Sequence, residues 1–131
     1  MKVLVINSDN KMSVKELDNF KDMQKIVNGY IEPVYPSHAY EDKLMNRNNC
    51  FIVDEEGLLK NKPINYMGTL LYNGIYNEDN PHPIVGDIII LGYDIEDFRG
   101  LTDCEIKFYE SKFSNLLNKI DVIVKEESKN V

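Results

Sequence analysis

The chain has 131 residues, a net charge of −7 and an apolar share of 43%. This length favours one domain with a real core, and no apolar run approaches the roughly 20 residues that a membrane span needs. The start MKVLVINSDN lacks the apolar segment and cleavage site of a signal peptide, and the two cysteines have no framework spacing. These features exclude a membrane protein and predict a cytoplasmic one.

The acidic charge is concentrated in one part of the chain. Residues 77–105 carry eight acidic side chains against one basic side chain, Arg99, so this window accounts for the whole net charge of −7. Such a field repels nucleic-acid phosphates and attracts basic partners, which argues against direct nucleic-acid binding. The simpler interpretation is a solvated acidic rim that keeps the protein soluble.

The first elements read as a strand, a second strand and a helix. Lys2–Asn7 is apolar on both faces, which predicts a central strand. Ser13–Asp18 alternates like a half-buried strand, so the two are expected to form a hairpin. A helix follows, with Asn19 as its N-cap and Asn28-Gly29 as its stop.

The middle of the chain predicts strands joined by polar segments. Residues 30–36 read as a strand, and Pro33 within it indicates a sheet edge or a bulge. Residues 37–49 are polar and aperiodic, which predicts a surface excursion. Residues 50–59 suggest a strand, a tight turn at 55–57 and a second short strand. Residues 64–73 have helical spacing but an interior glycine, which weakens the helix signal.

The last third predicts a loop, a buried strand and the best-marked helix. Residues 74–83 read as a loop, and 84–93 as a buried strand rich in β-branched residues. Thr102 and Glu105 have the spacing of a capping box, and Leu101 and Ile106 that of its hydrophobic staple. One apolar stripe then follows, formed by Ile106, Tyr109, Phe113, Leu116 and Ile120. The tail, about residues 126–131, is expected to fray.

These elements predict an α+β fold. We expect a single domain over residues 1–131, with its core in about 1–120 and a mixed, mainly antiparallel sheet of about five strands. Two principal helices should pack on this sheet. The strand at Val3–Ile6 should lie inside the sheet, and the helix from Thr102 should pack its Ile106–Phe113 stripe on it.

No complete catalytic or cofactor motif is present. Gly86 and Gly92 have the wrong spacing for a phosphate-binding loop, and the segment from Asp94 lacks several oxygen ligands of a calcium loop. Cysteines and histidines are scattered singly, unlike zinc ligands. Cys104 would begin a helix, but acidic neighbours oppose a thiolate, so we interpret it as a buried, inert thiol. The sequence therefore predicts no cofactor, no metal and no catalytic residue.

Two features favour ligand binding. The start of the last helix at Thr102, with Arg99 nearby, has amides that hold anions in other proteins, although the capping box would use the same amides. Among eight tyrosines, Tyr66 and Tyr93 are expected at element ends, where an aromatic ring with a polar tip suits a pocket. The candidate ligand-binding residues are Tyr66, Tyr93, Arg99 and Thr102.

The chain resembles a known family, the domain of unknown function 3846 family of Firmicutes, their phages and other mobile elements. The matching stretches are MKVLVIN, MQKIVNGYIEPVYP, IVDEEGLLKNKPIN, GDIIILG and DFRGLTDCEIKFY, in the family's order over about residues 1–113. Residues 37–49, 74–83 and the tail past Asn115 depart from it. The resemblance brings no catalytic residues. It implies an accessory protein of a mobile element, used against the host.

Three functions follow as hypotheses. The first is a non-catalytic protein that sequesters a small nucleotide-type host signal, as a homo-oligomer; an anionic ligand would then need a pocket away from the acidic window, with Lys60, Lys62 or Arg47. The second is an inhibitor that resembles DNA and binds a basic host protein through Asp94, Glu96 and Asp97. The third is a small hydrolase that uses these same carboxylates. A membrane partner is not expected.

Overall fold

The computed structural model describes residues 1–36, 48–73, 83–95 and 97–129, with side chains up to Lys119. Its strands are β1 (Lys2–Asn7), β2 (Lys11–Glu16), β3 (Ile31–Val34), β4 (Asn49–Asp54), β5 (Ile88–Tyr93) and β6 (Phe98–Arg99). Its helices are α1 (Phe20–Val27), α2 (Tyr66–Asn73) and α3 (Asp103–Lys129).

The strands form one six-stranded sheet in the order β2-β1-β5-β4-β3, with β6 added beside the end of β5. Every pairing in the described ranges is antiparallel, so the predicted α+β domain is confirmed and its sheet is antiparallel rather than mixed. Strand β1 lies between β2 and β5, which confirms its interior position. The middle of the order is β5, so β1 is interior but not the central strand; β4 and β5 are also apolar on both faces.

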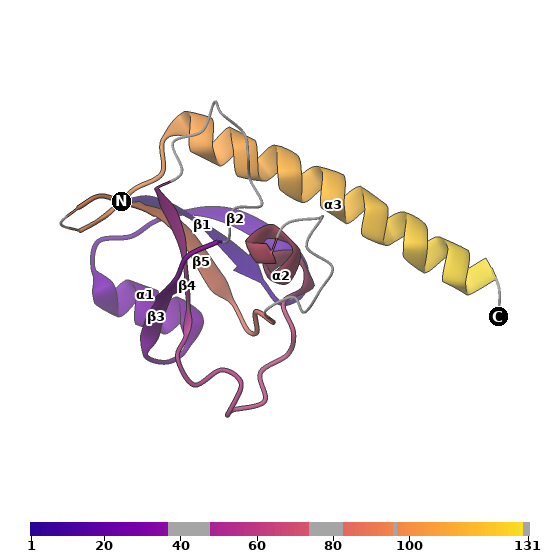
Figure 1. The fold of residues 1–131 in the computed structure, drawn as a ribbon, viewed down its shortest axis with the longest axis horizontal. Coiled ribbons are helices and arrows are strands. Elements are labelled where there is room, and N and C mark those ends of the chain that lie inside the picture. The colour runs from indigo at the N-terminus through magenta and orange to yellow at the C-terminus, as the bar shows by residue number, and fades with distance from the viewer. Residues whose placement is uncertain (37–47, 74–82, 96, 130–131) are drawn as a thin grey trace.

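Helices cover both faces of this sheet (Figure 1). Because side chains alternate along a strand, each interior strand supplies two cores. Val3 and Val5 of β1 pack with α1, whereas Leu4 and Ile6 pack with α2 and α3. The predicted stripe of α3 is buried from Ile106 to Leu116 on that second face. The long α3 then continues past the sheet (Figure 1).

The ends of α1 follow the predicted signals. Asn19 accepts a hydrogen bond from the Asp22 backbone at 3.1 Å, so it is the N-cap. Asn28 ends the helix in the left-handed conformation, with φ 56°. The next strand, β3, pairs only with β4 among the described strands, and its Pro33 therefore lies at a sheet edge as expected.

The glycine inside the predicted 64–73 helix has a packing reason. A Cβ on Gly68 would lie 2.8 Å from Ile88 Cδ1, so a larger residue here would have to displace the end of that buried side chain, and glycine lets α2 lie close to β5. Buried Asn65 begins this helix by accepting from the Gly68 backbone at 2.8 Å. Its amide donates to the carbonyls of Ile6 and Gly86, which fastens α2 to β1 and to the start of β5. The domain thus has three helices where two were expected.

Two other expectations need correction, and further ones are untested or fall on residues that the structure does not describe. No second short strand follows Gly57; the chain turns there, with the Lys62 backbone donating to the Gly57 carbonyl at 3.1 Å. Asn49 is buried as the first residue of β4, not part of a polar excursion. The helix α3 continues to Lys129, into the segment expected to fray, and the fraying itself stays a prediction. Residues 37–47 and 74–82, predicted as surface segments, lie outside the described residues.

Candidate functional site

Two of the predicted ligand residues, Arg99 and Thr102, meet at the start of α3, and both bind Glu105. Arg99 donates to Glu105 through two nitrogens, Nη1 to Oε1 at 2.7 Å and Nη2 to Oε2 at 3.1 Å. Strand β6 makes this possible because Arg99 pairs with Gly92, where a side chain would overlap the guanidinium. Arg99 is therefore committed to a bidentate ion pair.

The predicted capping box at this helix start is confirmed. The Thr102 hydroxyl accepts from the Glu105 backbone at 3.1 Å, and the Glu105 carboxylate accepts from the Thr102 backbone at 2.9 Å. Leu101 and Ile106, the predicted staple, are both buried in the same core. The hydroxyl and both of these amides thus serve the helix start itself, which is the simpler of the two interpretations given above.

Glu105 is 3% exposed and is the centre of a buried polar network. The Asn49 side-chain amide donates to its Oε2, and Tyr109 donates to the Asn49 oxygen at 3.0 Å. Burial alone would raise the pKa of Glu105, but the hydrogen bonds from Arg99, Thr102 and Asn49 outweigh it and lower the pKa. The network joins β4, β6 and α3 around one ionised carboxylate.

The two predicted tyrosines lie apart from each other. Tyr93 ends β5 and packs edge-on against Tyr35, with ring centroids 5.1 Å apart. Tyr66 begins α2 and is 59% exposed. Ile64, two residues before it, pairs with Val85, which comes just before the start of β5. The two tyrosines therefore lie toward opposite ends of β5. The four predicted residues do not line one common pocket, and ligand binding by any of them stays a prediction.

The acidic turn between β5 and β6 is a tight one. The Asp94 backbone donates to the Asp97 carbonyl at 2.9 Å, and the Asp97 backbone donates to the Asp94 carboxylate at 3.0 Å. Both aspartates are exposed, and Ile95 between them is fully exposed. Glu96 lies outside the described residues. In the described ranges no three His, Cys, Asp or Glu side chains group in a way that would hold a metal ion.

The two cysteines differ in environment. Cys50 is buried in β4, and burial raises the pKa of its thiol to about 12. Cys104 is exposed, so its predicted burial is wrong. It lies on the side of α3 away from the apolar stripe, as its spacing from Ile106 and Tyr109 requires in a helix.

A basic pocket that the sequence did not predict lies at the C-terminal end of α1. We call it the α1 pocket. It has a volume of about 540 Å³ and is open to solvent. Its lining residues come from α1, from the turn after it and from the 55–62 segment: Lys21, Gln24, Lys25, Asn28, Gly29, Tyr30 and Lys60. Three lysines and no acidic residue line it, in a protein of net charge −7.

An ion cluster beneath this pocket holds one of its lysines in place. Lys60 and Lys62 approach Asp54 Oδ2 at 2.9 Å and 2.7 Å. Their ammonium groups also donate to the Asn28 carbonyl, at 3.3 Å and 3.1 Å, at the end of α1. Burial alone would raise the pKa of Asp54, but hydrogen bonds from both lysines and the Glu56 backbone lower it to about 2.

The α1 pocket was missed because its parts are distant in sequence. Lys60 and Lys62 were named as alternative cations for an anionic ligand, but nothing local linked them to α1. One usable signal existed. Lys21 and Lys25 are four residues apart, so they share a helix face opposite the buried Met23 and Val27.

A family model for a domain of unknown function, DUF3846, matches residues 1–114. The chain belongs to the DUF3846 family. The DUF3846 match covers the whole sheet, α1, α2 and the anchored first part of α3. Comparisons with curated proteins and with solved structures found no match. None of the described helices of this DUF3846 protein is both long and apolar enough to span a membrane.

Proposed function

We propose that this DUF3846 protein binds a small phosphorylated, nucleotide-type molecule in the α1 pocket and releases it unchanged. The observation that carries the proposal is the placement of three lysines around one exposed tyrosine in a single pocket. Tyr30 is 66% exposed and Lys60 is fixed by its ion pair with Asp54. Lysine ammonium groups bind phosphates, and an exposed aromatic ring offers a base a stacking surface.

The local electrostatics support an anionic ligand despite the acidic chain. A helix C-terminus is ordinarily an unfavourable place for an anion, because its free carbonyls carry partial negative charge. Here Lys62 donates to the Val27 carbonyl at 2.5 Å, and both lysines donate to the Asn28 carbonyl. With Asp54 paired, the lysines of this cluster and of α1 leave the pocket a net positive charge.

The pocket size fits a molecule of this class. Ligand sites commonly have volumes of about 300–1,000 Å³, and the α1 pocket has about 540 Å³. Its open shape limits how much of a ligand it covers, so we expect micromolar rather than nanomolar binding. Sequestration at such an affinity requires an abundant protein.

Titration calorimetry with nucleoside mono- and diphosphates, and with inorganic phosphate as a probe of the cations alone, tests the proposal. The variant Lys21→Glu/Lys25→Glu should abolish binding. Tyr30→Ala should weaken the binding of nucleotides more than the binding of inorganic phosphate. A matched control, Lys107→Glu/Lys119→Glu on exposed positions of α3, makes the same charge change and should bind normally. Equal loss in both double variants, or no binding by the native protein, contradicts the proposal.

The fate of the ligand separates binding from catalysis. After incubation and heat denaturation, chromatography should recover the nucleotide unchanged. Its steady conversion would instead support the hydrolase hypothesis.

A further inference from the structure

We propose that the open edge of β2 pairs with the same edge of a second copy of this chain, in antiparallel register with Val14 on the two-fold axis. The two outer strands of the sheet differ in this respect. Strand β3 has four residues and carries Pro33, which lacks a backbone N–H. Strand β2 has six residues and no proline, and among the described strands it pairs only with β1.

The backbone of β2 has donors and acceptors along its outer side. The Leu17 backbone donates to the Met1 carbonyl at 2.8 Å, in line with the β1–β2 register. Hydrogen-bonding direction alternates along an antiparallel strand. Residues 13 and 15 therefore bond to β1, whereas Met12, Val14 and Glu16 direct their N–H and C=O groups to the open edge.

The charges of β2 select one register. Directly opposed residues of two antiparallel strands have their side chains on the same face of the sheet. A two-fold axis perpendicular to the sheet therefore places one residue of β2 opposite the same residue of the other copy. An axis at Ser13 places Lys11 opposite Lys15, and an axis at Lys15 places two lysines opposite each other, both unfavourable. An axis at Met12 leaves a much shorter overlap.

The axis at Val14 avoids these conflicts. It places Val14 opposite Val14, Ser13 opposite Lys15, and Met12 opposite Glu16. The outward groups of Met12, Val14 and Glu16 then form about six backbone hydrogen bonds between the copies. Of the registers compared, only this one pairs residues 12–16 of the two copies without placing like charges opposite each other.

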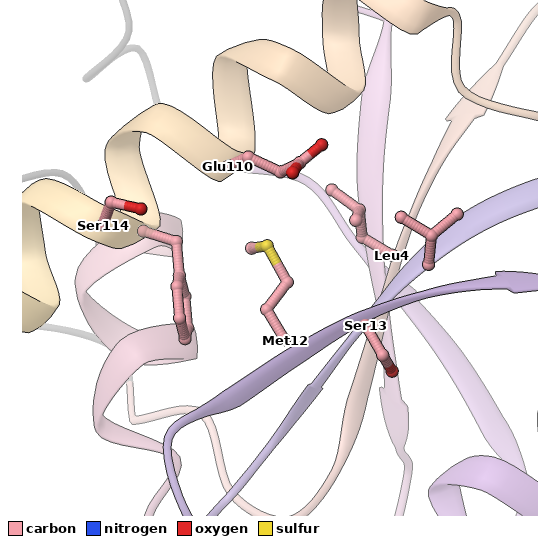
Figure 2. A pocket seen from close by; sticks show the side chains of 7 residues that line it. Leu4, Met12, Ser13, Glu110 and Ser114 are labelled. Carbon is pink, nitrogen blue, oxygen red and sulfur yellow. The ribbon is translucent and has the colours of Figure 1, made fainter.

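The surface beside this edge has room for a neighbour. A pocket of about 180 Å³ lies between β2 and α3, with Leu4, Met12 and Phe113 among its lining residues. Met12 points toward α3 and Ser13 points to the opposite side of the sheet (Figure 2). Val14 also lines the pocket, and its exposed fraction of 47% is large for an apolar side chain in a strand. A second copy would cover it.

The area that this contact buries predicts a weak dimer. Stable interfaces bury about 1,200–2,000 Å², and one pair of six-residue strands with its flanking side chains contributes less. We expect a monomer–dimer equilibrium that sedimentation velocity detects as a rise in mass with concentration.

Crosslinking tests the register directly. Directly opposed residues of a hydrogen-bonded pair have Cα atoms about 5.5 Å apart, within the range that a disulfide spans. In a Cys104→Ser background, Val14→Cys should form a covalent dimer on mild oxidation, whereas Ser13→Cys, opposite Lys15 of the other copy, should not. Equal crosslinking of both, or of neither, overturns the proposed pairing.

Two further variants test the interface without a crosslink. Val14→Pro removes an outward N–H, and Val14→Thr keeps it, so only the proline variant should lose the concentration-dependent rise in mass. If circular dichroism finds the proline variant unfolded, Val14→Lys decides, because it places two lysines opposite each other on the axis. A native chain that is monomeric at all concentrations, or a folded Val14→Lys chain that still dimerises, overturns the proposal.

Discussion

Arg99 and Glu105 form a bidentate ion pair at the start of α3, with the carboxylate 3% exposed and the two N–O distances at 2.7 Å and 3.1 Å. The same carboxylate closes the capping box with Thr102 and accepts from Asn49. One side chain therefore contributes to a helix cap, a β6 contact and a β4 contact. Its replacement should affect all three.

Glu105→Ala should lower the free energy of unfolding by about 3 kcal/mol, because it removes the carboxylate that pairs with Arg99 and accepts from Asn49, together with half of the cap. Thr102→Ala should cost about 1 kcal/mol, the usual cost of a lost N-cap. Urea unfolding followed by circular dichroism measures both. Glu110→Ala, at an exposed position of the same helix, is the control and should change little; an equal effect there would contradict the network's role.

Asp54 should make folding sensitive to acid. Its pKa falls from 3.8 to about 2 in the folded protein. As the pH drops, the Asp54 carboxylate is therefore protonated at a higher pH in the unfolded chain than in the folded protein. The stabilisation by Asp54 is therefore full above about pH 4 and is lost as the pH falls toward about 2. Thermal unfolding across this range should show a shallower pH dependence in Asp54→Asn than in the native protein.

Glu105 contributes to acid sensitivity in the same direction, since its pKa is also lowered. The Asp54→Asn variant should thus flatten the profile in part and not abolish its slope. An unchanged slope would show that the pKa of Asp54 is the same in the folded and unfolded states, which contradicts the lowered value.

The two thiols should react at different rates. Exposed Cys104 should react with a thiol reagent in the native protein, while buried Cys50, with a pKa of about 12, should react only after denaturation. A chromogenic disulfide reagent should therefore count one thiol in native protein and two in denaturant. Cys104→Ser should leave none in the native state, and a rapid reaction there would contradict the burial of Cys50.

Asn28 ends α1 with φ 56°, a conformation that L side chains other than asparagine and aspartate adopt at a cost. Asn28→Ala should lower the free energy of unfolding by about 1 kcal/mol, and Asn28→Gly should leave it equal or slightly higher. The melting temperatures of the two variants give the comparison. A more stable alanine variant would contradict the left-handed cap.

Local signals predicted the parts of the fold that depend on neighbouring residues. The caps at Asn19 and Thr102, the stop at Asn28 and the edge position of Pro33 all follow from chemistry within four residues. The interior glycine of α2 weakened a helix signal because its cause, close packing on Ile88, lies twenty residues further along the chain.

The candidate site depends on longer-range contacts, which the sequence does not reveal. Asn49 reaches Glu105 across 56 residues, and Lys60 reaches Asn28 across 32. No periodicity or spacing encodes such pairs. The exposure of Cys104, in contrast, was predictable, since the stripe that begins at Ile106 already determines the outward side of the helix.

The anchoring of α3 at one end has a consequence for its amide protons. Its first turn is tied to the sheet through Glu105, whereas its distal half extends away from the body (Figure 1). Opening the first turn requires breaking contacts with β4 and β6, whereas turns near a helix end open by fraying. Hydrogen–deuterium exchange should therefore proceed as a gradient along this one helix, from near-global protection at Glu105 to rapid exchange toward Lys129.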